Sequence, residues 1–322
     1  MSPDPQRVTV SIGERELQLS SLDKPLYPSG FTKRDVIDYY ARIAPVLLSH
    51  LAGRPVTVKR FPQGSHHPGF IEKNVPKHAP AWIRTVTLPR RPDGRWGAGR
   101  DGRDDREQRE QRDTTRYVMV DELATVVWLA NLAALEFHTP MWRVGPDATP
   151  LPPDLVVFDL DPGAPADIAQ CCRVALRLRE RAGADGVDLV PKTSGSKGLQ
   201  LYAPVAGAAW GPEETVAYAH ALAEELEADD PGLVVSRMAK ALRTGRVLID
   251  WSQNSGSKTT VSAYSLRALD RPTVSTPLTW DEVEAGVDGG ADTLLGFGPH
   301  EVLARVDDGG DLFEVLVGPG RA

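Results

Sequence analysis

Two aspartates separated by one residue end an apolar run, in Val156-Val-Phe-Asp-Leu-Asp-Pro-Gly163. Side chains alternate along a strand, so Asp159 and Asp161 are predicted to share one face while the apolar residues beside them face the other way. Two carboxylates on one face repel each other unless a cation lies between them, and oxygen ligands of this kind suit Mg²⁺ or Mn²⁺. The alternative interpretation is a solvated turn in which Asp-Pro-Gly simply ends the strand.

A third carboxylate, Asp250, ends a second apolar strand, Arg246-Val-Leu-Ile-Asp250. Its apolar neighbours predict that the carboxylate lies at the margin of a cleft, two strands away from the first pair. Three strand-borne aspartates are what two-metal nucleotidyl transfer requires, because they can hold two cations that orient a triphosphate and lower the pKa of an attacking hydroxyl. The alternative is that Asp250 caps the turn that follows it.

The tetrapeptide Ser-Gly-Ser-Lys occurs twice, at residues 194–197 and 255–258. Glycine frees backbone N–H groups to form an anion-binding nest, the hydroxyls donate hydrogen bonds, and lysine adds charge. Neither copy has the Gly-x4-Gly-Lys-Ser/Thr spacing of a P-loop, so ordinary flexible turns are the alternative. Arg243, Arg246 and Arg267 flank these segments and are predicted to form a triphosphate clamp, although each by itself is typical of a surface arginine.

The histidines give a weaker signal. His138 follows an apolar segment over residues 123–135, predicted to be a buried helix, and precedes the strand with the two aspartates. A core or capping histidine is the ordinary interpretation, and a nucleotide contact is the alternative. His66 and His67 lie in a polar loop without thiol partners, so we do not predict a metal site there.

Helices and strands must interleave to bring these residues together. Thr32 is a predicted N-cap, with Asp35 three residues later, for a helix whose apolar spacing continues until Gly53. Further helices are predicted over 123–135, 168–181 and 212–228, and strands over 56–61, 117–120, 154–160, 187–190, 199–203, 246–251 and 260–264. This pattern indicates an α+β fold with several sheet pairings.

The net charge of −7 is unevenly divided along the chain. Residues 1–120 carry 21 Lys and Arg against 14 Asp and Glu, whereas residues 121–322 carry 16 against 30. Contacts with polyanions are local, so the basic segment is compatible with nucleic-acid binding despite the negative sum. Within it, residues 90–116 hold nine arginines, seven acidic residues and almost nothing apolar, which predicts a solvated, mobile loop.

Composition also predicts where the chain works. It has no apolar run of about 18 residues and no apolar segment at its N-terminus, which argues against a membrane span and a secretory signal. The two cysteines, Cys171 and Cys172, are adjacent; they cannot form a Cys-based zinc site alone, and neighbouring cysteines rarely bridge. We expect a cytoplasmic, nucleoid-associated protein with no membrane partner.

Taken together, the motifs resemble the polymerase domain of bacterial ligase D, which belongs to the archaeo-eukaryotic primase superfamily. The resemblance rests on Phe158-Asp-Leu-Asp-Pro-Gly163, Thr193-Ser-Gly-Ser-Lys-Gly198, and Val247-Leu-Ile-Asp-Trp-Ser-Gln-Asn-Ser-Gly-Ser-Lys-Thr259 with Tyr264-Ser-Leu-Arg267. It continues through Asp23-Lys-Pro-Leu-Tyr-Pro28, Phe70-Ile-Glu-Lys-Asn74 and Gly309-Gly-Asp-Leu-Phe313, and so covers nearly the whole chain. No Lys-x-Asp-Gly adenylation motif of a ligase occurs, so the resemblance is to a stand-alone polymerase module.

The resemblance implies roles for individual residues. Asp159, Asp161 and Asp250 match the metal-binding catalytic carboxylates. Nucleotide-binding positions are matched by Ser194, Lys197, Gln200, Arg243, Gln253 and Arg267, and by His138 on the sugar side. Lys24 and Lys33 match a pair that binds the 5′-phosphate at the downstream edge of a gap, and template-contacting positions are matched by Lys59, Arg60 and Phe70.

Three positions depart from the pattern of that family. Gln200 stands where the family usually has histidine, which bears on nucleotide binding or rate. Ile71 stands where a second aromatic residue often follows Phe70, and the stretch 90–116 is longer than the expected connection. The last two bear on how the template and the DNA ends are held.

The resemblance implies one primase-like catalytic domain over residues 1–322, with two lobes around a central cleft. The lobe of about residues 1–120 is the DNA-binding side, and residues 121–322 bind metal and nucleotide. The implied activity is template-dependent extension of 3′-hydroxyl ends at gaps or double-strand breaks, in non-homologous end joining or another DNA repair process. It uses two divalent ions, Mn²⁺ preferred and Mg²⁺ as the alternative, with NTPs favoured over dNTPs. Implied partners are Ku and a separate ATP-dependent DNA ligase. Alternative functions are a DNA primase and a catalytically weakened DNA-end-binding accessory protein.

Overall fold

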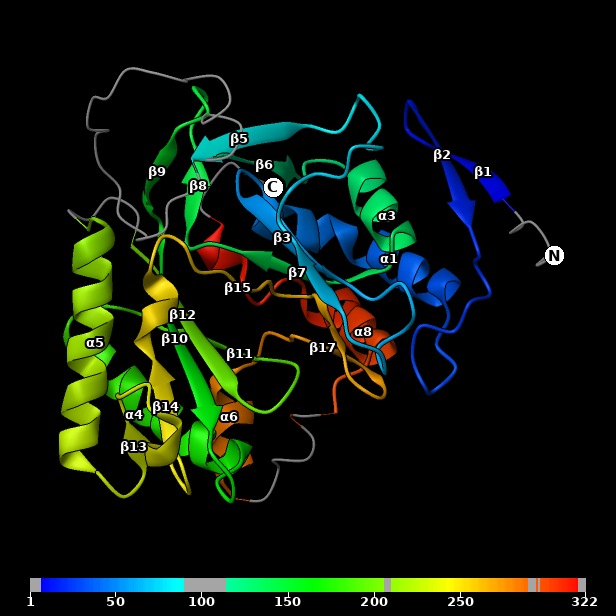
Figure 1. Cartoon of the computed structure of the whole chain (residues 1–322). Helices are drawn as coiled ribbons and strands as arrows, with labels where there is room; N and C mark the ends of the chain where they lie inside the picture. The colour runs from blue at the N-terminus through cyan, green and yellow to red at the C-terminus, as the bar shows by residue number, and fades with distance from the viewer. Residues whose placement is uncertain (1–6, 90–113, 206–209, 289–293, 295, 318–322) are drawn as a thin grey trace.

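The computed structural model describes residues 7–89, 114–205, 210–288, 294 and 296–317. Two sheets dominate it (Figure 1). The first has five strands in the order β11-β12-β10-β14-β13. Its strands are β10 (Leu155–Pro162), β11 (Val190–Thr193), β12 (Leu199–Pro204), β13 (Val234–Val235) and β14 (Val247–Asp250). Helices α4 (Ile168–Ala184) and α5 (Pro212–Asp229) pack against its central strand β10, and α6 (Trp280–Val287) contacts its edge strand β11.

The second sheet has six strands in the order β15-β7-β3-β6-β5, with β4 also paired to β3. These strands are β3 (Pro55–Arg60), β4 (Phe70–Glu72), β5 (Thr85–Pro89), β6 (Thr114–Met119), β7 (Ala134–Thr139) and β15 (Thr260–Val261). Beside it lie α1 (Lys33–Leu51), α3 (Leu123–Asn131) and α8 (Pro299–Gly309), as Figure 1 shows. Buried apolar side chains of both sheets, Phe137 and Phe158 among them, belong to one connected core.

Short hairpins and single turns complete the described chain. The hairpins are β1 (Arg7–Ile12) with β2 (Arg15–Ser20), β8 (Trp142–Val144) with β9 (Pro150–Pro153), and β16 (Leu266–Ala268) with β17 (Pro272–Val274). The 3₁₀ turns are η1 (Lys240–Leu242), η2 (Trp251–Asn254) and η3 (Glu314–Leu316).

The predicted N-terminus of the first long helix is confirmed in detail. The Thr32 side chain accepts from the Asp35 backbone N–H, and the Asp35 carboxylate accepts from the Thr32 backbone N–H, so the two form a capping box. This box fixes where α1 begins, and the preceding residues 21–31 form the loop that carries Lys24.

Several predicted elements were wrong in extent. The helix predicted over 123–135 ends at Asn131, and the next residues form strand β7, so His138 is a strand residue. Helix α3 is apolar on all sides, and such a segment gives no periodicity from which to locate its end. The strand predicted over 187–190 lies at 190–193, and the one predicted over 260–264 stops at Val261.

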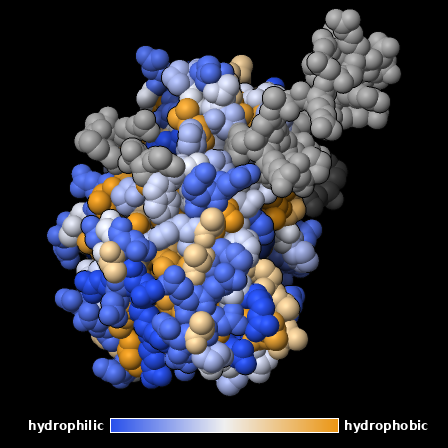
Figure 2. Space-filling model, turned by 90° about the vertical axis from the view of Figure 1, so that its left-hand side faces the viewer, coloured by the Kyte–Doolittle hydropathy of each residue, from blue (hydrophilic) through white to orange (hydrophobic). Residues whose placement is uncertain are grey.

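Two further expectations concern the surface. Most of the predicted loop over 90–116 lies outside the described residues, and residues 114–116 belong to β6. Among the described helices, none combines the length and apolar character needed to cross a bilayer. On the face shown in Figure 2, hydrophobic residues are scattered among hydrophilic ones.

Candidate active site

The three predicted aspartates lie together at one end of the five-stranded sheet. Strands β10 and β14 are direct neighbours, so the expectation that Asp250 lies two strands from the first pair was wrong. Asp159 stands opposite Asp250 in their antiparallel register, and Asp161 follows two residues later on the same face. One carboxylate oxygen from each residue lies within 4.8 Å of the others.

The electrostatics of this cluster favour a bound cation. Burial and the neighbouring Asp161 raise the pKa of Asp159 to about 7. Burial and Asp250 also raise the pKa of Asp161, against the opposing charges of Arg243, Arg267 and Lys197. Carboxylates that resist ionisation together are stabilised in their charged form by a cation among them. A donor set made only of carboxylate oxygens fits Mg²⁺ or Mn²⁺, so these three residues could hold the divalent ions.

Gln200 lies directly behind the cluster. It stands opposite Asp159 on β12, is only 4 % exposed, and its Nε2 donates to Asp159 Oδ1 at 3.0 Å. Its Oε1 accepts from Lys192 Nζ at 2.6 Å and from the Tyr202 hydroxyl at 3.0 Å. Because the amide oxygen already has two donors, the amide nitrogen must face Asp159. All these contacts are to protein groups, and a nucleotide contact by Gln200 stays a prediction.

Lys192 was not identified in the sequence. It is 1 % exposed on β11, opposite Gln200, and its ammonium group also donates to Ser275 Oγ at 2.5 Å. Burial lowers its pKa, while the charge of Asp159 opposes that shift. In the sequence, Lys192 is distinguished only by its place just before the first Ser-Gly-Ser-Lys turn. Because the strand was predicted over 187–190 and not over 190–193, the pairing of Lys192 with Gln200 could not be predicted.

This geometry gives an expected result for Gln200. A neutral histidine has one donor and one acceptor nitrogen, so in Gln200→His the ring can accept from Lys192 and donate to Asp159. We expect Gln200→His to change the rate of primer extension less than about tenfold, which is about 1.4 kcal/mol of barrier. Gln200→Ala should lower the rate further, because it leaves the buried ammonium group and Asp159 without their shared partner.

The check is steady-state primer extension by both variants. A gain of a hundredfold or more in Gln200→His would contradict this account, and would show that the natural glutamine impairs catalysis.

The first Ser-Gly-Ser-Lys turn connects β11 to β12 beside the aspartates. Ser194 Oγ accepts from the backbone N–H groups of Ser196 at 3.2 Å and Gly198 at 3.1 Å. These two N–H groups, predicted to be available to an anion, therefore have an internal partner that shapes the turn. Exposed Lys197 lies close enough to Asp161 for its charge to oppose the rise in the pKa of that carboxylate.

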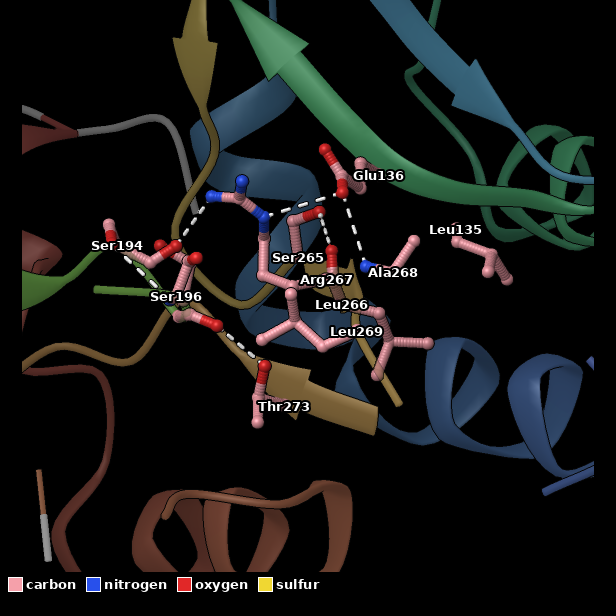
Figure 3. A network of polar contacts seen from close by, with 12 residues as sticks. Leu135, Glu136, Ser194, Ser196, Ser265, Leu266, Arg267, Ala268, Leu269 and Thr273 are labelled. Carbon is pink, nitrogen blue, oxygen red and sulfur yellow. Dashed lines mark hydrogen bonds and ion pairs between the residues drawn. The ribbon is translucent and has the colours of Figure 1, made fainter. Parts of the chain in front are cut away.

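Arg267 links this turn to the second sheet (Figure 3). Its Nη1 donates to the Ser194 carbonyl at 2.6 Å, and its Nε lies 3.4 Å from Glu136 Oε1. Thr273 donates to the Gly195 carbonyl at 2.5 Å, so the β16–β17 hairpin holds the turn at a second point.

An unusual backbone conformation directs the chain toward Arg267. Tyr264 has φ of +64°, a region that a bulky side chain rarely adopts. Its carbonyl accepts from the Tyr39 hydroxyl, its N–H donates to the Ser275 carbonyl, and its hydroxyl donates to Asp311. These bonds offset a conformational cost of about 1–3 kcal/mol, three residues before Arg267.

His138 and Arg267 share one carboxylate. Glu136, two residues before His138 on β7, is 3 % exposed, and its Oε2 lies 3.0 Å from His138 Nε2. Its Oε1 accepts from the Ala268 backbone N–H at 3.1 Å. Glu136 was not predicted as a site residue. Its alternation with His138 along β7 would have indicated it, but the start of that strand was predicted to be helical.

Arg243 is held close to Asp161 by a backbone approach at Gly163. A Cβ on Gly163 would lie 2.0 Å from the Arg243 carbonyl oxygen, so only glycine allows the two segments to meet. Arg243 Nη2 donates to the Met238 carbonyl at 2.7 Å. Its buried Nε is without a hydrogen-bond partner among the described residues.

Gln253 and the second Ser-Gly-Ser-Lys turn lie after Asp250. Gln253 Nε2 donates to Asp250 Oδ2 at 2.9 Å, so it contacts a carboxylate of the cluster. The second turn directly follows Asn254, whose side-chain amide forms hydrogen bonds with the backbone of Val157. Within the turn, the Gly256 carbonyl accepts from Trp142 Nε1. Those contacts place it away from Asp161, and no described contact joins it to the aspartates.

The predicted DNA-binding residues surround the start of α1 and the adjacent strands. Lys33 is 8 % exposed, and its Nζ donates to the Ser20 carbonyl at 2.9 Å. Burial and the nearby charges of Lys24 and Arg60 lower the pKa of Lys33 to about 8. Lys24 and Arg60 are therefore near enough to Lys33 to act on its charge, and phosphate binding by Lys24 and Lys33 stays a prediction.

Strands β3 and β4 bear the predicted template contacts. The Arg60 guanidinium lies 5.3 Å from the centre of the Phe70 ring and pairs with Glu72 at 3.0 Å. Phe70 is 45 % exposed and Ile71 is 65 % exposed, so both offer apolar surface on this edge. Lys59 Nζ lies 5.1 Å from the centre of the Phe61 ring. Lys59 stands opposite Glu136 in the pairing of β3 with β7, and contacts of these residues with a template stay a prediction.

Comparisons with known proteins agree with these observations. The sequence model of the LigD primase-polymerase domain matches residues 32–313. The multifunctional non-homologous end joining DNA repair protein LigD of Mycobacterium tuberculosis is 42 % identical over 312 residues, which are 95 % of this chain and 38 % of that protein. The bifunctional non-homologous end joining protein LigD of Bacillus subtilis is 30 % identical over 273 residues, which are 84 % of this chain and 40 % of that protein. The chain therefore spans about two-fifths of the length of these relatives.

A solved structure matches as well. The polymerase domain from Mycobacterium tuberculosis ligase D in complex with DNA has a TM-score of 0.80 and 41 % identity, and the match covers 94 % of this chain and 98 % of that one. The predicted α+β, primase-like fold class is confirmed by this match.

Proposed function

Because this chain belongs to the LigD primase-polymerase domain family, we propose that it is a template-dependent nucleotidyltransferase that extends 3′-hydroxyl ends at gaps or double-strand breaks. The observation that carries the proposal is the meeting of Asp159, Asp161 and Asp250 within 4.8 Å, beside cationic groups suited to a triphosphate. We place this activity in end joining or a related DNA repair process, in the cytoplasm at the nucleoid.

The three aspartates would hold two divalent ions, Mn²⁺ in preference to Mg²⁺. When bound, such ions neutralise phosphate charge and lower the pKa of the attacking 3′-hydroxyl. The protein would supply the rest: Lys197, Arg243 and Arg267 would face the anionic triphosphate. Because these cationic groups are already in place, little reorganisation is needed during the reaction. The Gln200 amide orients the Asp159 carboxylate through its hydrogen bond, and Gln253 does the same for Asp250.

The nucleotide would lie between the Ser194–Gly198 turn and β7. Ser194 and the turn's lysine would contact its phosphates, and His138 its sugar. We propose NTPs, preferred over dNTPs, as the substrate.

DNA would bind on the basic lobe of about residues 1–120, in one catalytic domain that spans residues 1–322. Lys24 and Lys33 would bind the 5′-phosphate at the downstream side of a gap, with the template on Lys59, Arg60 and Phe70. Phosphate contacts position the duplex without reading its sequence, which suits an enzyme that must accept any broken end. We propose Ku and a separate ATP-dependent DNA ligase as protein partners.

The lowered pKa of Lys33 gives this site a pH dependence. Lys33 is protonated below pH 8 and loses its charge above it, so the preference for a 5′-phosphate over a 5′-hydroxyl should decline as pH rises. For a pKa of about 8 in the free protein, the protonated fraction falls about tenfold between pH 7 and pH 9, which limits the loss to about that factor.

Fluorescence anisotropy with two otherwise identical gapped duplexes measures this preference. Lys33→Arg, which keeps its charge, should flatten the pH profile, and the Lys24→Ala/Lys33→Ala double variant should remove the preference at every pH. Equal losses on both duplexes in the double variant would mean that the lysines provide only general electrostatic attraction.

One assay distinguishes the proposed function from its alternatives. The chain is incubated with Mn²⁺, NTPs or dNTPs, and a gapped duplex with or without a 3′-primer. Synthesis only when a primer is present supports the proposal. Products formed without a primer indicate a primase, and DNA binding without synthesis indicates an accessory protein.

A further inference from the structure

Glu136 on β7 lies beside the β16–β17 hairpin, and its carboxylate contacts two nucleotide-binding candidates at once. The side chain of Glu136 is 4 % exposed, and that of His138 is 21 % exposed. Glu136 Oε2 faces His138 Nε2, while Oε1 faces Arg267 Nε and the Ala268 backbone N–H. Figure 3 shows Glu136 and Ser194 on opposite sides of the Arg267 guanidinium. One carboxylate thus connects the sugar side of the proposed site to its phosphate side.

The charge state of Glu136 decides what His138 can do. Burial alone would raise the pKa of Glu136, but the hydrogen bond with His138 and the charge of Arg267 outweigh it and lower the pKa to about 2. The carboxylate is therefore ionised near neutral pH and can only accept hydrogen bonds. His138 Nε2 must then carry a proton and donate it to Glu136 Oε2.

His138 is neutral in this setting. Burial, with the positive charges of Arg267 and Lys59, lowers the pKa of its ring, and the opposing effect of Glu136 is smaller. A neutral imidazole has a single N–H. With that proton on Nε2, Nδ1 is a hydrogen-bond acceptor, which suits the sugar hydroxyl that the proposed function places beside His138.

We infer that Glu136 is a positioning residue of the nucleotide site, which fixes His138 as the Nε2–H tautomer and holds the Arg267 guanidinium against the Ser194 turn. The nucleotide as ligand rests on the proposed function, whereas the His138 tautomer rests on the contacts of Glu136 alone. It assigns Glu136 no contact with the reacting atoms, so its effect is on nucleotide affinity.

Glu136→Gln tests this role with almost no change in volume. The Ala268 N–H and Arg267 Nε require an acceptor, so the glutamine oxygen should face them and its NH₂ group should face His138. His138 Nε2 must then accept, which moves the ring proton to Nδ1 and turns the acceptor on the sugar side into a donor.

Two measurements follow. Nitrogen-15 NMR of histidine-labelled protein should show the Nε2–H tautomer of His138 in the wild type and the Nδ1–H tautomer in E136Q. Calorimetric titration with Mg·ATP should show about tenfold weaker binding by E136Q, as expected for loss of hydrogen bonds to a charged group. The kcat for extension at saturating ATP should stay within about threefold of the wild type.

Glu282→Gln is the matched control. Glu282 also pairs through both oxygens with an arginine, Arg305, but in α6 and α8. The Glu282→Gln variant should leave the His138 tautomer and the ATP affinity unchanged. This control shows whether an effect of E136Q comes from losing the charge at Glu136 or from losing any carboxylate paired with an arginine.

The outcomes are distinct. An Nδ1–H tautomer in the wild type would overturn the inference, and this test holds even if E136Q fails to fold. An E136Q protein with the wild-type tautomer or with wild-type ATP affinity would overturn it as well. If the wild type binds no Mg·ATP but shows the Nε2–H tautomer, the proposed function fails while the geometry assigned to Glu136 stands.

Discussion

Asp159→Asn should reduce nucleotide addition at least about a hundredfold, a loss of about 2.7 kcal/mol of transition-state stabilisation. Asn keeps the shape of Asp and an oxygen that can accept from the Gln200 amide, so the strand pairing should survive. It removes the charge that a divalent ion requires at this position. The phosphate contacts of DNA lie elsewhere, so affinity for gapped DNA should stay within about twofold.

Single-turnover extension and DNA-binding titrations on the same preparation give both numbers. Asp188→Asn, at an exposed position, is the control and should match the wild type in each. More than about a tenth of the wild-type rate in Asp159→Asn would contradict the assignment of the metal site.

Gly198→Ala should destabilise the protein by about 3 kcal/mol, at the upper end of what overpacking costs, and should also weaken nucleotide binding. A Cβ at this position would lie 1.9 Å from the Leu160 carbonyl oxygen. Leu160 belongs to β10 and Gly198 directly precedes β12, which pairs with β10 from Leu199 onward, so neither backbone can move without separating the phosphate turn from the aspartate strand.

Urea unfolding monitored by tryptophan fluorescence measures the loss. The control is Gly183→Ala, because Gly183 lies in α4 with nothing near its missing Cβ, where alanine should stabilise by up to about 1 kcal/mol. Equal stability of Gly198→Ala and the wild type would show that the two strands are not held as closely as described.

The sequence predicted the triad because one local rule was enough. Alternation places Asp159 and Asp161 on one face, and an apolar run that ends at Asp250 places it at a strand end. Alternation along one strand does not indicate which strands are neighbours in the sheet, because that order is set by packing between distant segments. That is why Asp250 was expected two strands away and is opposite Asp159 instead.

Lys192 and Glu136, which contact the predicted site residues, could not be predicted from sequence patterns for a related reason. Lys192 and Glu136 act through partners that only the sheet register identifies: Lys192 faces Gln200 across β11 and β12, and Glu136 faces Arg267 across two sheets. Buried charges at such positions are decided by long-range contacts, whereas the capping box at Thr32 is decided within four residues and was predicted correctly.

The most direct test of the central claim is gap filling on four duplexes that differ only in the templating base. Each has a one-nucleotide gap and a downstream 5′-phosphate, and all four NTPs are present with Mn²⁺. The proposed function predicts that the wild type adds the complementary nucleotide to each primer, and that Asp159→Asn adds none at the same protein concentration. Addition that ignores the templating base, or that persists in Asp159→Asn, would contradict it.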